Sequence, residues 1–355
     1  MTADAPATTE TTAEALLAAA PPAPPAATDG GRPRIGLVLT GGGEVGIAWH
    51  AAVLEALAAW SGWNPDDAEV VVGTSAGSWI AALLRAGIDA ALLVPLATDE
   101  AIADPQGALE LLGDPVVVPR ARRPRPWPPS SPRLLGRALR RDSGVRPATV
   151  LTGLLPSGTL ALSDHSEGLR RVYGERWPER ALWLPAVDLE SGRRVVFGSA
   201  GAPRARVDEA VAASCSVPAY FSPTVIGGRR YVDGGTHSVA NLDLVAGLDL
   251  DLVVVSSPIT ADVPRAVRGA DGRSRRYLHR RVLREAARVR ESGTPVVIAA
   301  PTAEDLAAMG TVFQALERER RRPTTETARR TLRRRLDHGL LGRELALLAA
   351  VRPTR

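Results

Sequence analysis

The sequence predicts a three-layer α/β/α fold with a largely parallel central sheet. An apolar run at 35–40 ends in Gly41-Gly42-Gly43, and a helical pattern follows from Gly46 to about Trp60. A second apolar run at 69–72 ends in a glycine-flanked turn and is followed by a helical pattern at 78–86. Strand, glycine turn and helix in this repeated order are typical of βα units. The composition agrees, because 45% of residues are hydrophobic but only 4% are aromatic, which leaves Ala, Leu and Val for tight helix packing.

The later part of the chain continues the same α/β pattern. Two short strands at 182–189 and 195–197 are joined by a hairpin-like turn at 190–192. The remaining expected elements are a helix at 207–215, a short strand at 230–232, buried parallel strands at 252–255 and 295–299, and Arg-rich helix to about Ala349.

Composition divides the chain into three parts. Residues 1–33 are rich in Ala, Pro and Thr and are expected to form a disordered tail. A main domain is predicted over 34–310, with an insertion at 89–160, and an Arg-rich helical extension over 311–355.

The insertion is dense in Pro and Arg, and part of it forms a basic amphipathic pattern. Four apolar residues could share one helix face between flanking arginines, namely Leu134, Leu135, Ala138 and Leu139. The pattern suits a surface insertion with a short docked helix. A lid, or a peripheral membrane contact through 120–141, is the alternative.

Charge and cysteine content narrow the class of protein. A formal net charge of +5 is too small on 355 residues to indicate nucleic-acid binding, and all basic residues are arginine. Cys215 is the only cysteine, so no intrachain disulfide can form. No basic segment precedes an apolar one at the N-terminus, and Arg85 and Asp89 interrupt the long apolar run at 80–97. A cytoplasmic protein is therefore expected, with peripheral contact at the inner membrane face.

The turn Gly73-Thr74-Ser75-Ala76-Gly77 fits the G-x-S-x-G pattern between a strand and a helix. Such a sharp turn exposes the serine hydroxyl, and small flanking residues allow the strand and helix to approach closely. The helix N-terminus places partial positive charge beside a developing oxyanion. Ser75 is therefore a candidate nucleophile, although an ordinary glycine-flanked turn would read the same.

The run from Gly41 to Gly46 follows the first strand and opens a helix. Glycines there allow backbone amides to converge on an anion, which suits an oxyanion hole or a phosphate. The run also fits G-x-G-x-x-G, the dinucleotide pattern, which expects an acidic residue at the end of the second strand. Since the serine turn stands at that place instead, the sequence favours an oxyanion hole.

Asp233-Gly234-Gly235 directly follows the short strand and could supply a base. A serine hydroxyl is a poor nucleophile unless a nearby group takes its proton. The five histidines have less distinctive settings: His50 on the first helix is expected to be structural, His165 and His338 solvated, and His279 lies among arginines. His237, close to Asp233 in sequence, stays open as an alternative base.

Together these motifs resemble the patatin-like phospholipase family, in which a glycine-rich oxyanion motif, G-x-S-x-G and D-G-[GA] occur in this order. The runs at 185–192 and 213–221 are also similar to that family, and the likeness spans roughly 34–260, with a weaker part around 295–310.

The resemblance implies a Ser75–Asp233 dyad without histidine, with the amides of Gly42, Gly43 and Ala76 holding the oxyanion. It implies a lipid or ester substrate, cleaved by a phospholipase A or lysophospholipase-like reaction, and neither metal nor organic cofactor. One departure is Val45, preceded by Glu44, where many members carry Arg or Lys. The alternatives are a Ser-Asp-His esterase of α/β-hydrolase type and a non-catalytic lipid- or nucleotide-binding protein.

Overall fold

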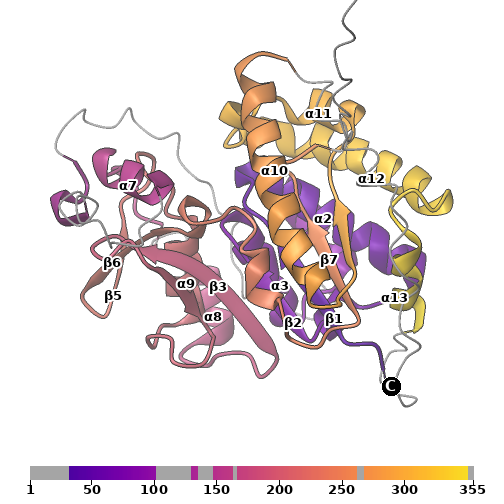
Figure 1. Cartoon of the computed structure of the whole chain (residues 1–355), viewed down its shortest axis with the longest axis horizontal. Helices are drawn as coiled ribbons and strands as arrows, with labels where there is room; N and C mark the ends of the chain where they lie inside the picture. The colour runs from indigo at the N-terminus through magenta and orange to yellow at the C-terminus, as the bar shows by residue number, and fades with distance from the viewer. Residues whose placement is uncertain (1–31, 101–128, 135–146, 163–165, 262–267, 351–355) are drawn as a thin grey trace, which may run out of the picture.

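The computed structural model describes residues 32–100, 129–134, 147–162, 166–261 and 268–350. Within them, strands form one sheet in the order β5-β6-β3-β2-β1-β7-β8, with β4 paired to β3 outside this path. Its parallel part joins β3 to the four strands β2 (Val70–Gly73), β1 (Ile35–Leu39), β7 (Leu252–Ser256) and β8 (Val296–Ala299). The predicted α/β class with a mostly parallel sheet is confirmed (Figure 1).

Strand β3 (Ala181–Asp188) links the parallel and antiparallel parts of the sheet. Its first residues pair in parallel with β2, so that Val72 lies opposite Trp183. Its later residues pair antiparallel with β6 (Arg229–Asp233), so that Asp233 lies opposite Ala186. The ends of β2 and β6 therefore lie three residues apart along one strand. The outer antiparallel strands are β4 (Arg194–Phe197) on β3 and β5 (Thr224–Ile226) on β6.

The strands bury both faces, because neighbouring residues of a strand point to opposite sides. On one face, Leu37, Val71 and Val254 belong to the core that also contains residues of α2 (Gly43–Ser61), α3 (Ala76–Arg85), α4 (Ala90–Thr98), α9 (Val207–Cys215) and α12 (Arg321–Asp337). On the other face, Val38 and Val253 pack with α10 (Gly269–Glu291). Figure 1 shows α10 in front of β7, with α2 behind it.

The predicted elements agree with the structure to within a few residues. The helix at 207–215 is α9, and the two strands with their turn at 190–192 are the hairpin of β3 and β4. The first helix begins at Gly43 rather than Gly46, because the glycine run already adopts the first helical turn. The remaining elements include α7 (Pro147–Leu154), α8 (Glu167–Tyr173), α11 (Ala303–Met309), α13 (Ala346–Ala350) and the 3-10 turns η4 (Gly234–Thr236), η5 (Leu242–Val245), η6 (Val312–Gln314) and η7 (Arg318–Arg320).

Two segments outside the family-like motifs pack into the main core. Leu93 and Val94 of α4 and Leu332 and Leu336 of α12 are buried there. Both helices contact α2, which begins with the glycine-rich run. The segments 1–31, most of 120–141, and His165 lie outside the described residues, so the expected tail and membrane contact stay predictions.

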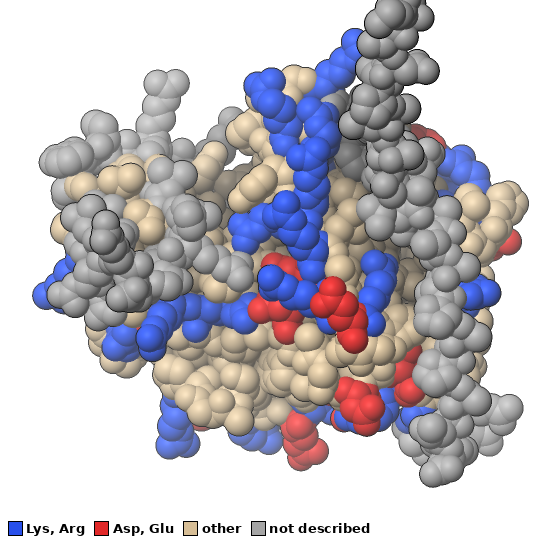
Figure 2. Space-filling view, in the orientation of Figure 1, with Lys and Arg blue, Asp and Glu red and all other residues tan. Residues whose placement is uncertain are grey.

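The outer face of α10 carries a band of arginines. Figure 2 shows these basic side chains over the position that α10 occupies in Figure 1. Among the described residues, no helix is long and apolar enough to cross a membrane.

Candidate active site

Ser75 lies in a strained turn between β2 and α3. Its φ of 53° and ψ of −122° fall in a region that non-glycine residues rarely adopt. Glycine is required on either side, since a Cβ on Gly77 would lie 2.1 Å from the carbonyl oxygen of Leu39, and one on Gly73 would lie 2.6 Å from that of Gly77. The turn therefore has the close strand-to-helix approach that the G-x-S-x-G pattern predicts.

Neighbouring polar groups hold the backbone of Ser75 in this conformation. Its N–H donates to Ser214 Oγ at 3.1 Å, and that hydroxyl donates to the carbonyl oxygen of Pro185 at 2.7 Å. Its own carbonyl oxygen accepts from Ser78 Oγ at 2.6 Å and from Cys215 Sγ at 3.2 Å. Burial raises the pKa of the Cys215 thiol to about 12, so the thiol stays protonated at neutral pH.

The glycine-rich run passes directly beside Ser75. A Cβ on Gly41 would lie 3.6 Å from Ser75 Cβ, and the Gly41 N–H donates to the carbonyl oxygen of Val239 at 2.9 Å. Gly43 has a φ of 61°, and a Cβ there would lie 2.6 Å from the carbonyl oxygen of Ala315. Gly46 is already inside α2 and donates to the carbonyl oxygen of Gly42 at 2.9 Å.

Three amides beside Ser75 are left without an acceptor within the part of the chain that the structure describes. They belong to Gly42, which directly precedes α2, and to Gly43 and Ala76, the first residues of α2 and α3. The first N–H groups of a helix have no intrahelical partner and carry partial positive charge. This set of donors can therefore bind a negatively charged oxygen.

Asp233, at the end of β6, is buried and accepts a hydrogen bond from the Ser75 hydroxyl. Burial raises its pKa from 3.8 to about 6, although the bonds from Ser75 and from the Gly235 amide, at 2.6 Å, lower it in part. Gly234 allows the close approach to β3, because a Cβ there would lie 2.3 Å from the carbonyl oxygen of Pro185. The carboxylate can thus accept a proton from Ser75 near neutral pH.

The histidines have different surroundings. His50 is buried, and its Nε2 donates to the carbonyl oxygen of Thr40 at 2.8 Å while Nδ1 accepts from the Ser256 hydroxyl at 2.7 Å. Burial lowers its pKa to about 4, so it is a neutral link between the ends of β1 and β7, which confirms the structural role expected for it. His237 is half-buried, its carbonyl oxygen accepts from Arg281 at 2.9 Å, and the exposed His338 follows α12.

Comparison with known proteins decides the family. The sequence profile described as patatin-like phospholipase matches residues 37–246, which is more than half of the chain and includes Ser75 and Asp233. The chain belongs to the patatin-like phospholipase family.

Two solved structures are similar to this family member at low sequence identity. VipD from Legionella pneumophila matches with a TM-score of 0.42 and 16% identity, over 87% of this chain and 67% of VipD. The type III effector protein ExoU matches with a TM-score of 0.35 and 19% identity, over 86% of this chain and 53% of ExoU. This chain therefore spans only about half the length of ExoU.

A buried loop ties the motifs of this patatin-like site together. Asn241 Nδ2 donates to Thr74 Oγ1 at 3.1 Å and to the carbonyl oxygen of Ser238 at 2.6 Å. The buried Glu285 of α10 accepts from the Ser238 hydroxyl at 2.6 Å and from the Leu242 N–H at 3.0 Å. Since Val239 in this loop also binds Gly41, Glu285 supports both the glycine-rich run and the turn that contains Ser75.

Neither this loop nor its anchor, Glu285, was among the site residues expected from the sequence. Glu285 does carry a signal in the sequence, because it falls on the apolar face of α10 beside Val282, Ala286 and Val289. Burial raises its pKa, while both of its oxygens accept hydrogen bonds that favour the ionised form.

Replacing Glu285 with glutamine is expected to lower kcat for a soluble ester roughly tenfold to a hundredfold, because displacement of the loop misplaces the oxyanion amides. Glutamine has one accepting oxygen, so either the Ser238 hydroxyl or the Leu242 amide would face its NH₂ group. The free energy of unfolding should fall by about 1–3 kcal/mol. Denaturant unfolding and ester turnover measure both effects, and Glu291→Gln on the exposed face of α10 is the control. Wild-type turnover in Glu285→Gln would contradict the positioning role.

Where many family members carry Arg or Lys, this chain has Val45, and the structure shows what surrounds it. Val45 is buried, and its N–H donates to the carbonyl oxygen of Ala315 at 3.1 Å. Glu44 beside it forms a buried ion pair with Arg321 of α12. Burial raises the pKa of Glu44, and the Arg321 charge opposes that rise. The residues after α11 therefore brace the first turn of α2, where the free amides lie.

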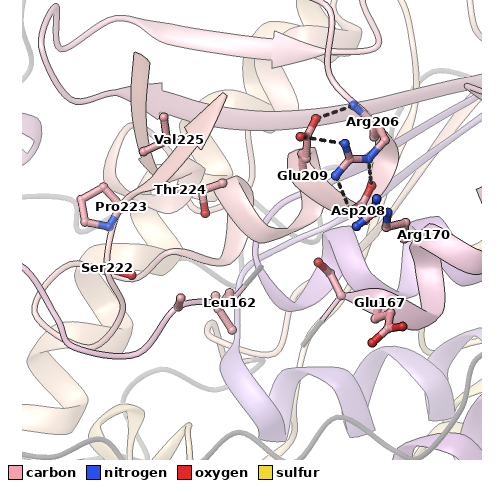
Figure 3. A pocket seen from close by; sticks show the side chains of 12 residues that line it. Leu162, Glu167, Arg170, Arg206, Asp208, Glu209, Ser222, Pro223, Thr224 and Val225 are labelled. Atoms are coloured by element: carbon pink, nitrogen blue, oxygen red, sulfur yellow. Dashed lines mark hydrogen bonds and ion pairs between the residues drawn. The ribbon is translucent and has the colours of Figure 1, made fainter. Parts of the chain in front are cut away.

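A separate pocket of about 490 Å³ lies between α8, the start of α9 and β5. Figure 3 shows Arg206 paired with Asp208 and Glu209 along its wall. Its lining includes neither Ser75 nor Asp233, and Arg206 is already paired with two of its acidic side chains. Among the described residues, no group of three or more His, Cys, Asp and Glu side chains could hold a metal ion.

Proposed function

We propose that this protein hydrolyses fatty-acyl ester bonds of lipids through Ser75 and Asp233. The observation that carries the proposal is the hydrogen bond from the Ser75 hydroxyl to a carboxylate with a pKa near 6, beside three amides that have no acceptor among the described residues. A base is most effective when its pKa lies near the working pH. Membership of the patatin-like phospholipase family supports a lipid ester as substrate.

In the proposed reaction, Ser75 Oγ attacks the ester carbonyl carbon while Asp233 takes the hydroxyl proton. The amides of Gly42, Gly43 and Ala76 bind the oxyanion of the tetrahedral intermediate, and such donors contribute roughly a hundredfold or more each. The intermediate collapses to an acyl-enzyme as the alcohol leaves with the proton from Asp233. Water then gives a proton to Asp233 and attacks the acyl-enzyme carbonyl. When the second tetrahedral intermediate collapses, Ser75 Oγ leaves with that proton from Asp233 and the fatty acid is released.

The substrate class proposed here is a phospholipid or lysophospholipid. The Val45 position lacks the cation that many family members carry, and its neighbour Glu44 is neutralised by Arg321.

A cytoplasmic location, with membrane contact through 120–141, remains part of the proposal. Incubating the purified protein with phospholipid, lysophospholipid and triacylglycerol, and identifying released acids by mass spectrometry, tests the substrate class. Release of fatty acid from neither the phospholipid nor the lysophospholipid would reject this substrate class.

The proposed dyad and a Ser-Asp-His triad differ in the turnover that they predict for His237→Ala. The proposed dyad predicts that His237→Ala retains turnover of a soluble ester and fluorophosphonate labelling to within about threefold, because Asp233 itself is the base. The side-chain change leaves the main-chain bond from Arg281 to the residue 237 carbonyl in place. Loss of turnover by a hundredfold or more in a folded His237→Ala protein would favour the triad.

A further inference from the structure

The outer face of α10 carries an unpaired stripe of arginines. Arg273, Arg280, Arg284 and Arg288 are all exposed, and their spacing of seven, four and four residues places them on one helix face. Within the described ranges, none of the four has an ion-pair or hydrogen-bond partner. At 1.5 Å per residue, the stripe is about 22 Å long. Figure 2 shows the band of basic side chains along this helix.

The other Arg-rich helix is built differently. On α12, Arg322 contacts Glu100, Arg329 contacts Glu55, and Arg330 and Arg334 both contact Glu304. Among the described residues, four of the five exposed arginines of α12 thus have acidic partners, Arg333 being the exception, whereas none of the four arginines of the stripe on α10 has one. An arginine-rich composition alone does not explain that difference.

The unpaired stripe does not serve helix stability. Like charges four residues apart repel by a few tenths of a kcal/mol per pair, and a cation near a helix N-terminus, such as Arg273, opposes the helix dipole. Of the four stripe arginines, only Arg288 lies in the last turn, where a cation is favourable. Of the three acidic residues on this helix, Asp271 binds Arg275 and Glu285 is buried against the loop. The third, Glu291 at the C-terminal end, forms no ion pair with Arg288 among the described contacts. A face of this kind suits an anionic partner.

The helix that carries the stripe contacts segments next to the candidate active site. Arg281, on the same helix, donates to the carbonyl oxygen of His237, four residues after Asp233. At the N-terminal end of α10, two aromatic side chains are exposed, Tyr277 at 55% and Phe313 at 69%. Phe313 belongs to η6, which is fixed to α10 by the bond from the Val312 N–H to Asp271 at 2.7 Å, and Ala315 follows it to contact Gly43.

We propose that this stripe docks the protein on an anionic lipid surface, with Tyr277 and Phe313 as apolar anchors beside the site. This inference rests on the proposed function. Because the proposed substrate is a lipid, a lipid surface is a more suitable anionic partner for the stripe than another polyanion. Arginines bind lipid phosphates, and exposed aromatic rings enter the headgroup region. Docking through this face would bring lipid close to Ser75.

The test compares two variants with equal loss of charge in a Ser75→Ala background, which prevents lipid turnover during the assay. One carries Arg→Gln at the stripe positions 273, 280, 284 and 288. The control carries Arg→Gln at four exposed arginines elsewhere, namely Arg176, Arg193, Arg204 and Arg333. Each is sedimented with vesicles of phosphatidylcholine alone or mixed with phosphatidylglycerol, and circular dichroism checks the fold.

Near the surface, each arginine strengthens binding by about 1 kcal/mol, so the stripe variant should lose roughly 10²- to 10³-fold in partitioning to anionic vesicles. The control should stay within about threefold of its parent, and vesicles of phosphatidylcholine alone should bind weakly. Equal losses in both variants, or unchanged binding in the stripe variant, would overturn the docking surface. So would a stripe variant that loses binding to a single-stranded oligonucleotide but keeps vesicle binding. Stripe-dependent vesicle binding by a protein whose Ser75 form cleaves no lipid would reject the proposed function alone and leave the docking surface standing.

Discussion

Replacing Asp233 with asparagine is expected to lower kcat/KM for a soluble ester by about a thousandfold while leaving the protein folded. Asparagine has nearly the same shape and can still accept the bond from the Gly235 amide. It cannot take the proton of Ser75, so the hydroxyl stays a poor nucleophile. Initial rates on a short-chain ester measure the effect, and the control is Asp89→Asn, where an exposed aspartate caps α4.

The same substitution is expected to stabilise the protein at neutral and higher pH. The pKa of Asp233 rises from 3.8 to about 6 on folding, so folding is favoured when this group is protonated. That contribution is complete below about pH 4 and is lost as pH rises through about 6, and the difference corresponds to roughly 3 kcal/mol. Asparagine stays uncharged, so Asp233→Asn should unfold at higher denaturant concentration than wild type at pH 8, and at a similar concentration near pH 4.

Two results would contradict this account of Asp233. Turnover within tenfold of wild type in the folded asparagine variant would exclude Asp233 as the base. A variant less stable than wild type at pH 8 would show that the ionised carboxylate is a net stabilising group, against the direction of its pKa shift.

Replacing Ser75 with alanine is expected to abolish covalent labelling by a fluorophosphonate and to lower ester turnover on the order of 10⁵-fold or more. In the proposed mechanism this hydroxyl forms the acyl-enzyme, and no other side chain takes its place. The backbone contacts of residue 75 are retained, since they use its N–H and carbonyl oxygen. Gel fluorescence of the labelled protein, with mass spectrometry of the labelled peptide, locates the adduct.

Cys215→Ala is the matched control for labelling, because its thiol is the nucleophile nearest in chemistry and donates to the Ser75 carbonyl oxygen. The thiol is protonated at neutral pH, so this variant should label at a rate close to that of wild type. Wild-type protein that labels no faster than Ser75→Ala would reject the hydrolase and favour a binding protein on the same scaffold.

Apolar periodicity and glycine turns in the sequence predicted most of the fold. They suffice because the strands and helices end where glycine permits a turn or a close contact. The helix at 207–215 and the strands of the parallel sheet follow directly from apolar periodicity. The turn at 190–192 predicted the hairpin of β3 with β4, but the pairing of β3 with β2 and with β6 was not predictable, because it depends on strand register across distant segments. The hydrogen bond between Ser75 and Asp233 arises from that pairing, so the motifs alone indicate the pair without establishing its geometry.

The supporting groups around the site are the part that sequence patterns leave out. Glu285 becomes an anchor only after α10 packs on the sheet and buries its carboxylate against the Ser238 loop. Arg321 meets Glu44 only because α12 docks on α2. Each contact joins segments far apart in the chain, and neither has a spacing that marks it in advance.

The central claim is that a carboxylate, rather than an imidazole, activates Ser75. The rate of fluorophosphonate labelling of the wild-type protein as a function of pH tests it most directly. The rate should rise about tenfold per pH unit up to about pH 6 and then level off, with the same profile in His237→Ala. A rate that is independent of pH between about 4.5 and 8, or one whose pH dependence is lost on replacing His237, would contradict it.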